Sequence, residues 1–423
     1  MRISDRAVAV QAGPVDLIVL PTGIRDVVTV RGSVDTWPDF RAGGELVQEM
    51  MAGTLDKGTL QQDRFEIASV LENLGAQMSF SGSTARVRCS ARCLRADLDA
   101  VMGLLFEQLL QPAFDDSELD KSRDRLQASI QRGIADAGYR ADLALARRAY
   151  PAGHPNYMLS PDEEAAVVTA VDRNQVVAAH SRLLAGHPRL VIVGDVDVDA
   201  CRRAVESAAA GWSGSASPAT PDLPGTGIAK PGSEEVHIAD RDNLDVRWGH
   251  AVDLTRTDDD FLAAYMASFV LGGNFSARLM NIVRDKEGLT YGVGSGLRGF
   301  DQRYNGMWRV HVTLSQDNLD RGIEVTEAVL RDFVADGVTA DELLEKQDTI
   351  AGSFQVRLAT TAGIAGALLQ QMEDGRDASW VDRYPERVRG CTVEAVNESI
   401  ARYFDTDRLF RAVAGSIPER TEA

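Results

Sequence analysis

Histidines and acidic residues are the first candidates for metal or acid–base chemistry. The six histidines stand at positions 154, 180, 187, 237, 250 and 311, and no two of them are four residues apart. A helical zinc site needs two imidazoles at that spacing, because side chains at i and i+4 share one face of a helix. Glu45 and Glu49 have the spacing and could hold a hard cation through oxygen, but solvated carboxylates are the commoner outcome. The sequence therefore predicts no metal site in this chain.

A second group of residues could stabilise negative charge on an oxygen atom. Arg284 falls in the last turn of an expected helix over 275–287, Gly288 ends that helix, and Tyr291 lies on the expected strand that follows. A guanidinium and a phenol that converge on one oxygen can stabilise a developing oxyanion. Judged on the residues alone, Arg284 could instead interact with the helix's terminal carbonyls, and Tyr291 could be a core residue.

The four cysteines include no C-x-x-C pair, so the sequence predicts neither a zinc ribbon nor a redox motif. Cys89 and Cys93 lie four residues apart in an alternating run typical of a strand. On a strand they would share one face about 13 Å apart, too far for a disulfide. We expect both to be small core residues.

The two halves of the chain carry the same landmarks in the same order, which indicates a duplicated domain. Each half has a helical pattern that stops at a glycine, then alternating strands, an amphipathic helix and a long helix. The corresponding landmarks lie 213 to 224 residues apart and are Gly75 and Gly288, Leu98 and Leu319, and Glu118 and Glu342.

A segment rich in Gly, Ser and Pro over residues 211–230 reads as a linker between the halves. It divides the chain into an N-terminal lobe, 1–210, and a C-terminal lobe, 231–423. The order of strands and helices predicts an α+β class. We expect two duplicated lobes, each a mostly antiparallel sheet with helices packed on one face, arranged as a clamshell.

Two segments of the second half carry a resemblance to a known family. They are Leu271-Gly272-Gly273-Asn274-Phe275-Ser276-Ala277-Arg278-Leu279 and the run from Arg284 through Gly288-Leu289-Thr290-Tyr291. They resemble the L-G-G-x-x-S-R-L and R-E-x-x-G-L-x-Y segments of insulinase/pitrilysin-type metallopeptidases. Active members carry an inverted zinc motif, H-x-x-E-H, and a further Glu ligand about 75 residues later.

The resemblance implies that the catalytic metal chemistry is lost in this chain. The two histidine positions of the motif are occupied by Glu45 and Glu49, and the general-base position by Gln48. An amide cannot accept a proton from water, so Gln48 cannot replace that base. The further ligand position falls near Ser129. The chain is therefore expected to be inactive alone.

The resemblance also implies that the second half-site is kept. Arg284 and Tyr291 match the Arg and Tyr that hold the substrate carbonyl, and some relatives divide the two half-sites between subunits. The chain thus resembles a non-catalytic subunit that binds substrate and completes the site of a homologous, zinc-motif-bearing partner. We expect zinc in that partner and no cofactor in this chain. Two alternatives stay open: a structural or assembly subunit, and a peptide-binding clamshell without a role in proteolysis.

A weaker candidate for peptide binding is residues 78–84. In the family the matching edge strand pairs with extended substrate, and such pairing depends on backbone groups rather than on side chains. An ordinary hairpin that turns near Gly82 is the alternative.

The composition of the chain restricts the classes of molecule that we expect it to bind. The 423 residues carry a formal net charge of -18, which disfavours nucleic acid and anionic membranes and mildly favours neutral or basic polypeptides. No apolar stretch approaches the length of a membrane helix, so we expect no membrane partner. The first residues contain no apolar signal segment, which favours a cytoplasmic location; a trimmed periplasmic protein is the alternative.

Overall fold

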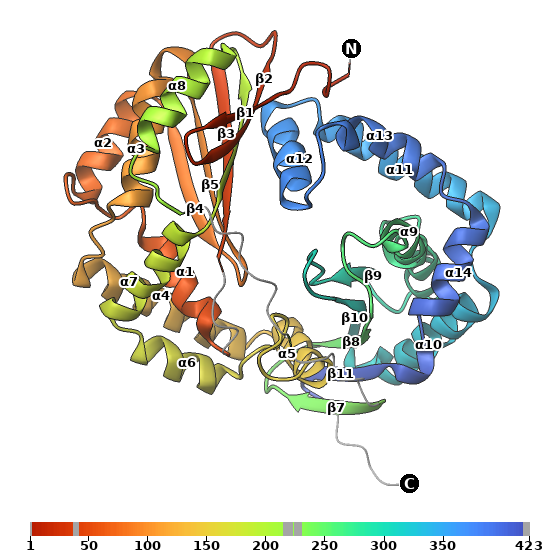
Figure 1. Cartoon of the computed structure of the whole chain (residues 1–423). Coiled ribbons are helices and arrows are strands. Elements are labelled where there is room, and N and C mark those ends of the chain that lie inside the picture. Colours follow the sequence, from red (N-terminus) through yellow and green to blue (C-terminus); the bar gives the residue numbers. More distant parts are fainter. Residues whose placement is uncertain (1, 37–41, 215–222, 224–230, 418–423) are drawn as a thin grey trace. The chain divides into compact units, whose positions relative to one another are not determined.

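The computed structural model describes residues 2–36, 42–214, 223 and 231–417 (Figure 1). These residues group into two compact units. Unit 1 consists of 1–128, 164–220 and 353–385, and unit 2 consists of 129–163, 221–352 and 386–423. Each unit thus takes a helical segment from the other half of the chain, unlike the expected lobes 1–210 and 231–423. Of the expected linker, only 211–214 and 223 lie among the described residues.

Unit 1 is built on a six-stranded sheet in which only the β2–β6 pair is parallel. Its order is β1 (Val8–Ala12), β2 (Val15–Pro21), β6 (Pro188–Gly194), β3 (Val27–Asp35), β5 (Arg86–Leu94) and β4 (Gln77–Gly82). Because β4 is last in this order, it is an edge strand.

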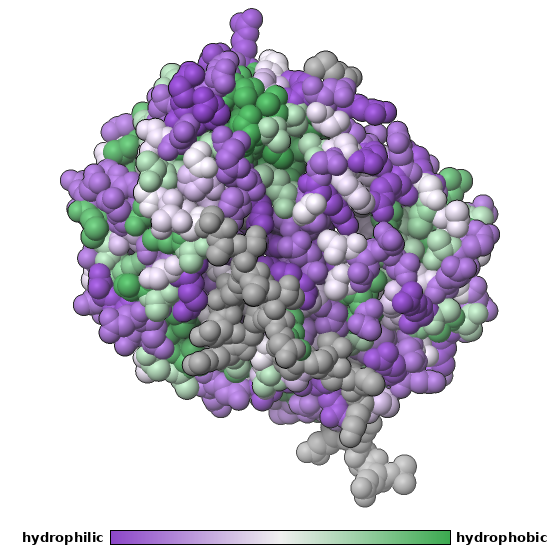
Figure 2. Space-filling view, viewed as in Figure 1, coloured by the Kyte–Doolittle hydropathy of each residue, from purple (hydrophilic) through white to green (hydrophobic). Residues whose placement is uncertain are grey.

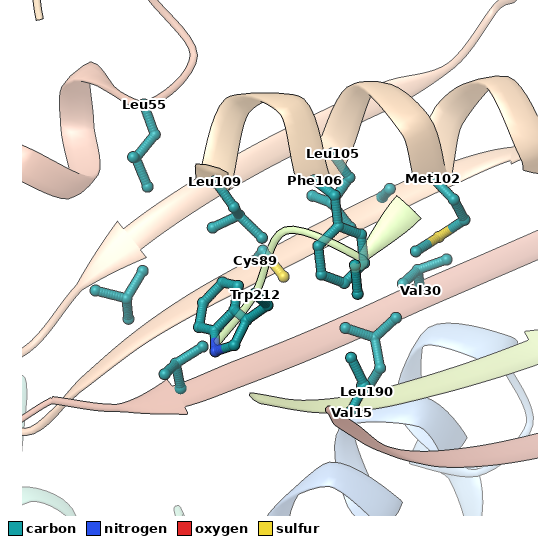
Figure 3. Close-up of a cluster of buried hydrophobic side chains, with 14 of the residues drawn as sticks. Val15, Val30, Leu55, Cys89, Met102, Leu105, Phe106, Leu109, Leu190 and Trp212 are labelled. Atoms are coloured by element: carbon teal, nitrogen blue, oxygen red, sulfur yellow. The ribbon is translucent and has the colours of Figure 1, made fainter. Parts of the chain in front are cut away.

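The main core of unit 1 lies between the sheet and helices on one of its faces. These helices include α1 (Gly44–Thr54), α2 (Arg64–Asn73), α3 (Leu98–Leu110), α7 (Arg173–Ala185) and α8 (Val198–Ala208). Phe106 and Leu109 of α3 meet Cys89 of β5 in this core (Figure 3). Cys89 and Cys93 are buried and unbridged, which confirms their core role. Burial raises the Cys89 thiol pKa to about 12.

The other face of the sheet is covered in part by α12 (Thr361–Glu373), a helix from the C-terminal half. Its Leu368 packs with Ile18, Leu20 and Val191 of β2 and β6 in a second apolar cluster. Most helices of unit 1 therefore lie on one face of the sheet, as expected, and α12 departs from the expectation because it packs on the other face. Arg88 of β5 anchors it through Glu373, with Nε to Oε1 at 2.9 Å and Nη2 to Oε2 at 2.6 Å.

Unit 2 is built on a five-stranded sheet that is antiparallel except for the β7–β11 pair. Its order is β7 (Gly232–His237), β11 (Phe410–Gly415), β8 (Asn243–Ala251), β10 (Met307–Ser315) and β9 (Gly292–Arg298). Trp248 and Trp308 are fully buried on one face of this sheet, where Trp308 packs against Phe404.

Helices of unit 2 include α9 (Phe261–Gly272), α10 (Leu319–Asp336) and α14 (Val393–Tyr403), together with α5 (Ala137–Ala149) from the N-terminal half. Leu145 and Ala149 of α5 pack with Phe410 and Ala412 of β11. Four further helices are α4 (Asp116–Ile134), α6 (Pro161–Ala170), α11 (Ala340–Arg357) and α13 (Ser379–Arg389), each spanning a boundary between the sequence segments of the units.

The duplication predicted from the landmarks is confirmed by the order of elements. Gly75 and Gly288 end their helices with positive φ angles of 58° and 67°. Helices α3 and α10 begin at Leu98 and Leu319. The two exchanged helices, α5 and α12, occupy the same place in the order of the two halves. One expectation was wrong in extent: the helix expected over 275–287 is a π-helix, η2, over Met280–Lys286.

Hydrophilic side chains predominate on the face drawn in Figure 2, as the net charge of -18 leads one to expect. Among the described residues, no helix combines the length and apolarity required to cross a bilayer.

Candidate functional site

The residue at the general-base position, Gln48, is used to hold the fold together. It lies on α1 and is only 3% exposed. Its side-chain amide donates to the backbone carbonyl of Ser83 and, at 3.4 Å, to that of Arg86. Ser83 lies in the turn between β4 and β5, and Arg86 is the first residue of β5, so Gln48 fastens α1 to the β4–β5 hairpin. An amide can make these contacts because it donates, whereas a carboxylate cannot.

The two histidine positions of the motif carry acidic side chains without a metal-binding environment. Partial burial raises the pKa of Glu45, and the neighbouring Glu49 adds to that rise. Glu45 also accepts a hydrogen bond from the backbone N–H of Gly43 at 3.1 Å. Within the described ranges, no group of three or more His, Cys, Asp or Glu side chains could hold a metal ion. Ser129 lies exposed on α4 and offers no imidazole or carboxylate. The residues present do not fit a zinc ion.

The Arg284 segment is built on an unusual local structure, the π-helix η2. The backbone N–H of Glu287 donates to Ile282 five residues back, and that of Leu289 donates to Val283. Single-turn π-helices are rare and occur often at functional sites. Gly288 then turns the chain in a left-handed conformation that a residue with a Cβ adopts at a cost, and β9 begins at Gly292.

Arg284 and Tyr291 both remain accessible. Arg284 is half-exposed, pairs with its neighbour Asp285 at 3.2 Å and lies 5.6 Å from the ring centre of Phe275. Tyr291 is 96% exposed, so the alternative of a core tyrosine is wrong. The two side chains share no hydrogen bond in the described part of the chain. Their convergence on a substrate oxygen therefore stays a prediction.

Other residues of the family-like segments are structural. Arg278 donates to the carboxylate of Glu342 from Nε at 3.0 Å and from Nη2 at 2.8 Å. It also donates to the backbone carbonyl of Gly337. Ser276 accepts from the fully buried Lys346 at 2.7 Å. These contacts join the segment around η2 to α11 and fix the base from which Arg284 and Tyr291 project.

A pocket of about 550 Å³ lies beside the edge strand β4, on the face of the unit 1 sheet that α12 covers in part. Arg31 of β3, Ser79 of β4 and Arg92 of β5 line it, and Thr361 at the start of α12 closes one side. Ser79 and Ser90 join β4 to β5 through their hydroxyls at 2.8 Å. The pocket offers hydroxyl and guanidinium groups next to a strand whose outer backbone edge pairs with no other strand of the described residues.

Sequence reasoning missed a basic cluster on the unit 2 sheet. Arg247, Arg309 and His311 come from β8 and β10, and Arg298 from β9. Arg309 and His311 alternate with apolar residues, a pattern that indicates one shared strand face. Their neighbours on β8 and β9 could not be known without the strand register.

Comparison with known proteins agrees with this picture. Residues 50–151 match the family described as Insulinase (Peptidase family M16), and residues 170–350 match the Peptidase M16 inactive domain. The non-peptidase homolog YmxG of Helicobacter pylori is 22% identical over 388 residues, which cover 89% of this chain and 88% of that protein. An uncharacterized zinc protease of Streptomyces coelicolor, SCO5738, is 24% identical over 352 residues, covering 81% and 72% of the two chains.

Among solved structures, the peptidase M16 inactive domain from Pseudomonas fluorescens superimposes with a TM-score of 0.86 at 21% identity over 98% of both chains. This likeness establishes the fold, and the residues at the zinc positions agree with the non-peptidase name of the Helicobacter relative. The chain therefore belongs to the insulinase family of peptidases, family M16, as a non-catalytic member that lacks the family's zinc ligands.

Proposed function

We propose that this chain is a substrate-binding subunit of a heteromeric zinc metallopeptidase, and that it completes the site of a homologous zinc-motif-bearing partner with Arg284 and Tyr291. The observation that carries the proposal is the exposure of Tyr291. A tyrosine that is 96% exposed contributes little to the folded chain, yet it follows a π-helix and a left-handed glycine that fix its place. A bound polypeptide would give this side chain a partner.

The chemistry of the pair suits a peptide carbonyl. The guanidinium of Arg284 stays charged at any physiological pH, and a phenol donates one hydrogen bond. Two donors directed at the carbonyl oxygen would hold the peptide and stabilise negative charge on that oxygen as it develops. No metal chemistry is required of this chain for that role, which fits the side chains at positions 45, 48 and 49.

A second candidate, polypeptide binding without any part in hydrolysis, is supported by the edge strand β4. An extended peptide could add to its free edge through backbone hydrogen bonds, with side chains entering the pocket lined by Arg31, Ser79 and Arg92. This role would need neither Arg284 nor Tyr291.

The test is peptide hydrolysis by the chain alone and by the chain mixed with a candidate zinc-motif partner, with zinc content measured for both. We expect no zinc and no activity in the chain alone, and activity in the mixture. Arg284→Ala and Tyr291→Phe should each lower the rate of the mixture at least tenfold, about 1.4 kcal/mol in the barrier.

Arg331→Ala is the matched control, because Arg331 is an exposed arginine of the same unit on α10. It should leave the rate unchanged. If Arg284→Ala and Tyr291→Phe behave like this control, the complementing role is wrong and a structural or peptide-binding subunit takes its place.

A further inference from the structure

The face of the unit 2 sheet on which α5 packs carries an arrangement that the proposed function does not explain. Alternate residues of a strand point to the same face, so Arg309 and His311 of β10 lie together on the face opposite the core residues Val310 and Val312. The register places His311 between Arg247 of β8 and Gly294 of β9.

The edge strand β9 presents no side chain beside them. Its positions on this face are Gly292, Gly294 and Gly296, until Arg298 ends the strand. The imidazole of His311 lies over Gly294, where an added Cβ would be 2.7 Å from its Cε1 atom. The guanidinium of Arg298 lies beside Gly296, with Nε 3.5 Å from the place of an added Cβ. Because these glycines have no side chains, the side chains of His311, Arg309 and Arg298 can lie close together over the backbone of β9.

Acidic side chains neutralise this cluster only in part. Asp142 of α5 accepts from Arg309 at 2.6 Å and lies 3.3 Å from Arg247, which also pairs with Asp245 at 3.0 Å. Arg298 is exposed, and it forms no ion pair with any described residue. Three guanidinium groups therefore face two carboxylates.

Burial is the main cause of a lowered pKa in two ionisable groups of this cluster, and the neighbouring charges modify it. Burial lowers the pKa of His311 to about 4, with contributions from Arg247, Arg309 and Arg298 that Asp142 opposes. Burial also lowers the pKa of Arg309; Asp142 opposes this shift, and Arg247 and Arg298 add to it. With the imidazole neutral, three guanidinium groups and two carboxylates leave an excess of positive charge that would favour an anionic group.

We propose that the strip formed by Arg298, Arg309 and His311 over Gly294 and Gly296 binds a carboxylate of a polypeptide ligand. The carboxylate would accept from Arg298 and from those nitrogens of Arg309 that Asp142 leaves free, and charged pairs of this kind are among the stronger hydrogen bonds. With the positive potential lowered, protonation of His311 would become less unfavourable. The ligand class is thus acidic, although the chain as a whole is acidic too.

This inference names the substrate chemistry of the polypeptide in the proposed function, but its test needs no partner subunit. The full chain is titrated with a pair of short peptides, acetylated and amidated at their ends, that differ only in one Glu or Gln. A third peptide carries Gln and a free C-terminus, so that side-chain and terminal carboxylates are distinguished. Affinity is measured calorimetrically, and the His311 pKa by NMR of its imidazole, with His311→Gln identifying the signal.

We expect one carboxylate peptide to bind at least tenfold more tightly than the amidated Gln peptide and to raise the His311 pKa by about one unit, because a bound anion favours the imidazolium. Arg298→Ala should remove this preference, whereas Arg331→Ala should keep it. Equal binding of all three peptides, an unmoved His311 pKa, or an unchanged preference in Arg298→Ala would overturn the inference. A failure in the hydrolysis test with intact carboxylate preference would reject the complementing role alone.

Discussion

The side-chain amide of Gln48 donates a hydrogen bond to the backbone carbonyl of Ser83, and this contact ties helix α1 to the β4–β5 hairpin. The position that resembles the family's general base has thus become a structural link. An amide has no usable basicity, so Gln48, buried against two carbonyls, has no acid–base role in the folded chain.

Gln48→Glu should destabilise the chain instead of restoring chemistry. The new carboxylate would face the carbonyls of Ser83 and Arg86 without a proton to donate, which costs about 3 kcal/mol for a buried charged group. Urea denaturation followed by circular dichroism measures the loss. Glu49→Gln on the same helix is the control, since Glu49 is exposed, and it should change stability by less than about 0.5 kcal/mol. Equal stability of the two variants would contradict the link.

The ion pair between Arg88 and Glu373 should matter more than an exposed pair. The Glu373 side chain is 1% exposed, so Arg88→Ala leaves a buried carboxylate without its bidentate partner, at a cost of about 3 kcal/mol. Arg95→Ala breaks the exposed pair with Asp195 and should cost less than about 1 kcal/mol. The urea midpoints of the two variants provide the comparison. A midpoint for Arg88→Ala as high as that for Arg95→Ala would show that Glu373 finds another partner.

Three glycine-to-alanine variants separate the cost of a positive φ angle from the gain in helix propensity, because none of the three sites has a packing contact. Gly75 and Gly288 have positive φ angles, and a Cβ at either position meets no atom within 4 Å. Alanine at each should therefore cost about 1 kcal/mol through its conformation alone. Gly352 lies inside helix α11 with equal space but without positive φ, so Gly352→Ala should stabilise by about 0.5 to 1 kcal/mol. Thermal unfolding of the three variants checks the opposite signs.

Acid should weaken the fold in part through His311. Its folded pKa of about 4 is below the value of 6.5 for a free imidazole, so the unfolded chain takes up the proton first as pH falls. Stability is therefore lost between about pH 6.5 and pH 4. His311→Gln should lose about 1 to 2 kcal/mol less than the wild type on going from pH 7 to pH 5. Urea titrations at both pH values measure this, with the exposed His237→Gln as a control that keeps the wild-type dependence.

The sequence by itself determined which chemistry this chain can perform. A side chain's ability to bind zinc or accept a proton is a property of the residue, so Glu45, Gln48 and Glu49 settle the loss of the zinc motif without any coordinates. The duplication was also readable, because Gly75 and Gly288 end corresponding helices at a nearly constant offset. Spacing along a helix or across a turn is local, and local patterns survive in the sequence.

Tertiary structure alone decided where those residues act. The exchange of α5 and α12 between the units follows from apolar surfaces that meet across more than a hundred residues, as Leu368 does with Ile18. The attachment of Gln48 to the Ser83 turn, and the meeting of Arg247, Arg298 and His311, depend on pairing between strands and helices distant in sequence. Composition and periodicity show which face of a strand is buried, but they leave its neighbours unspecified, because many registers bury the same apolar residues.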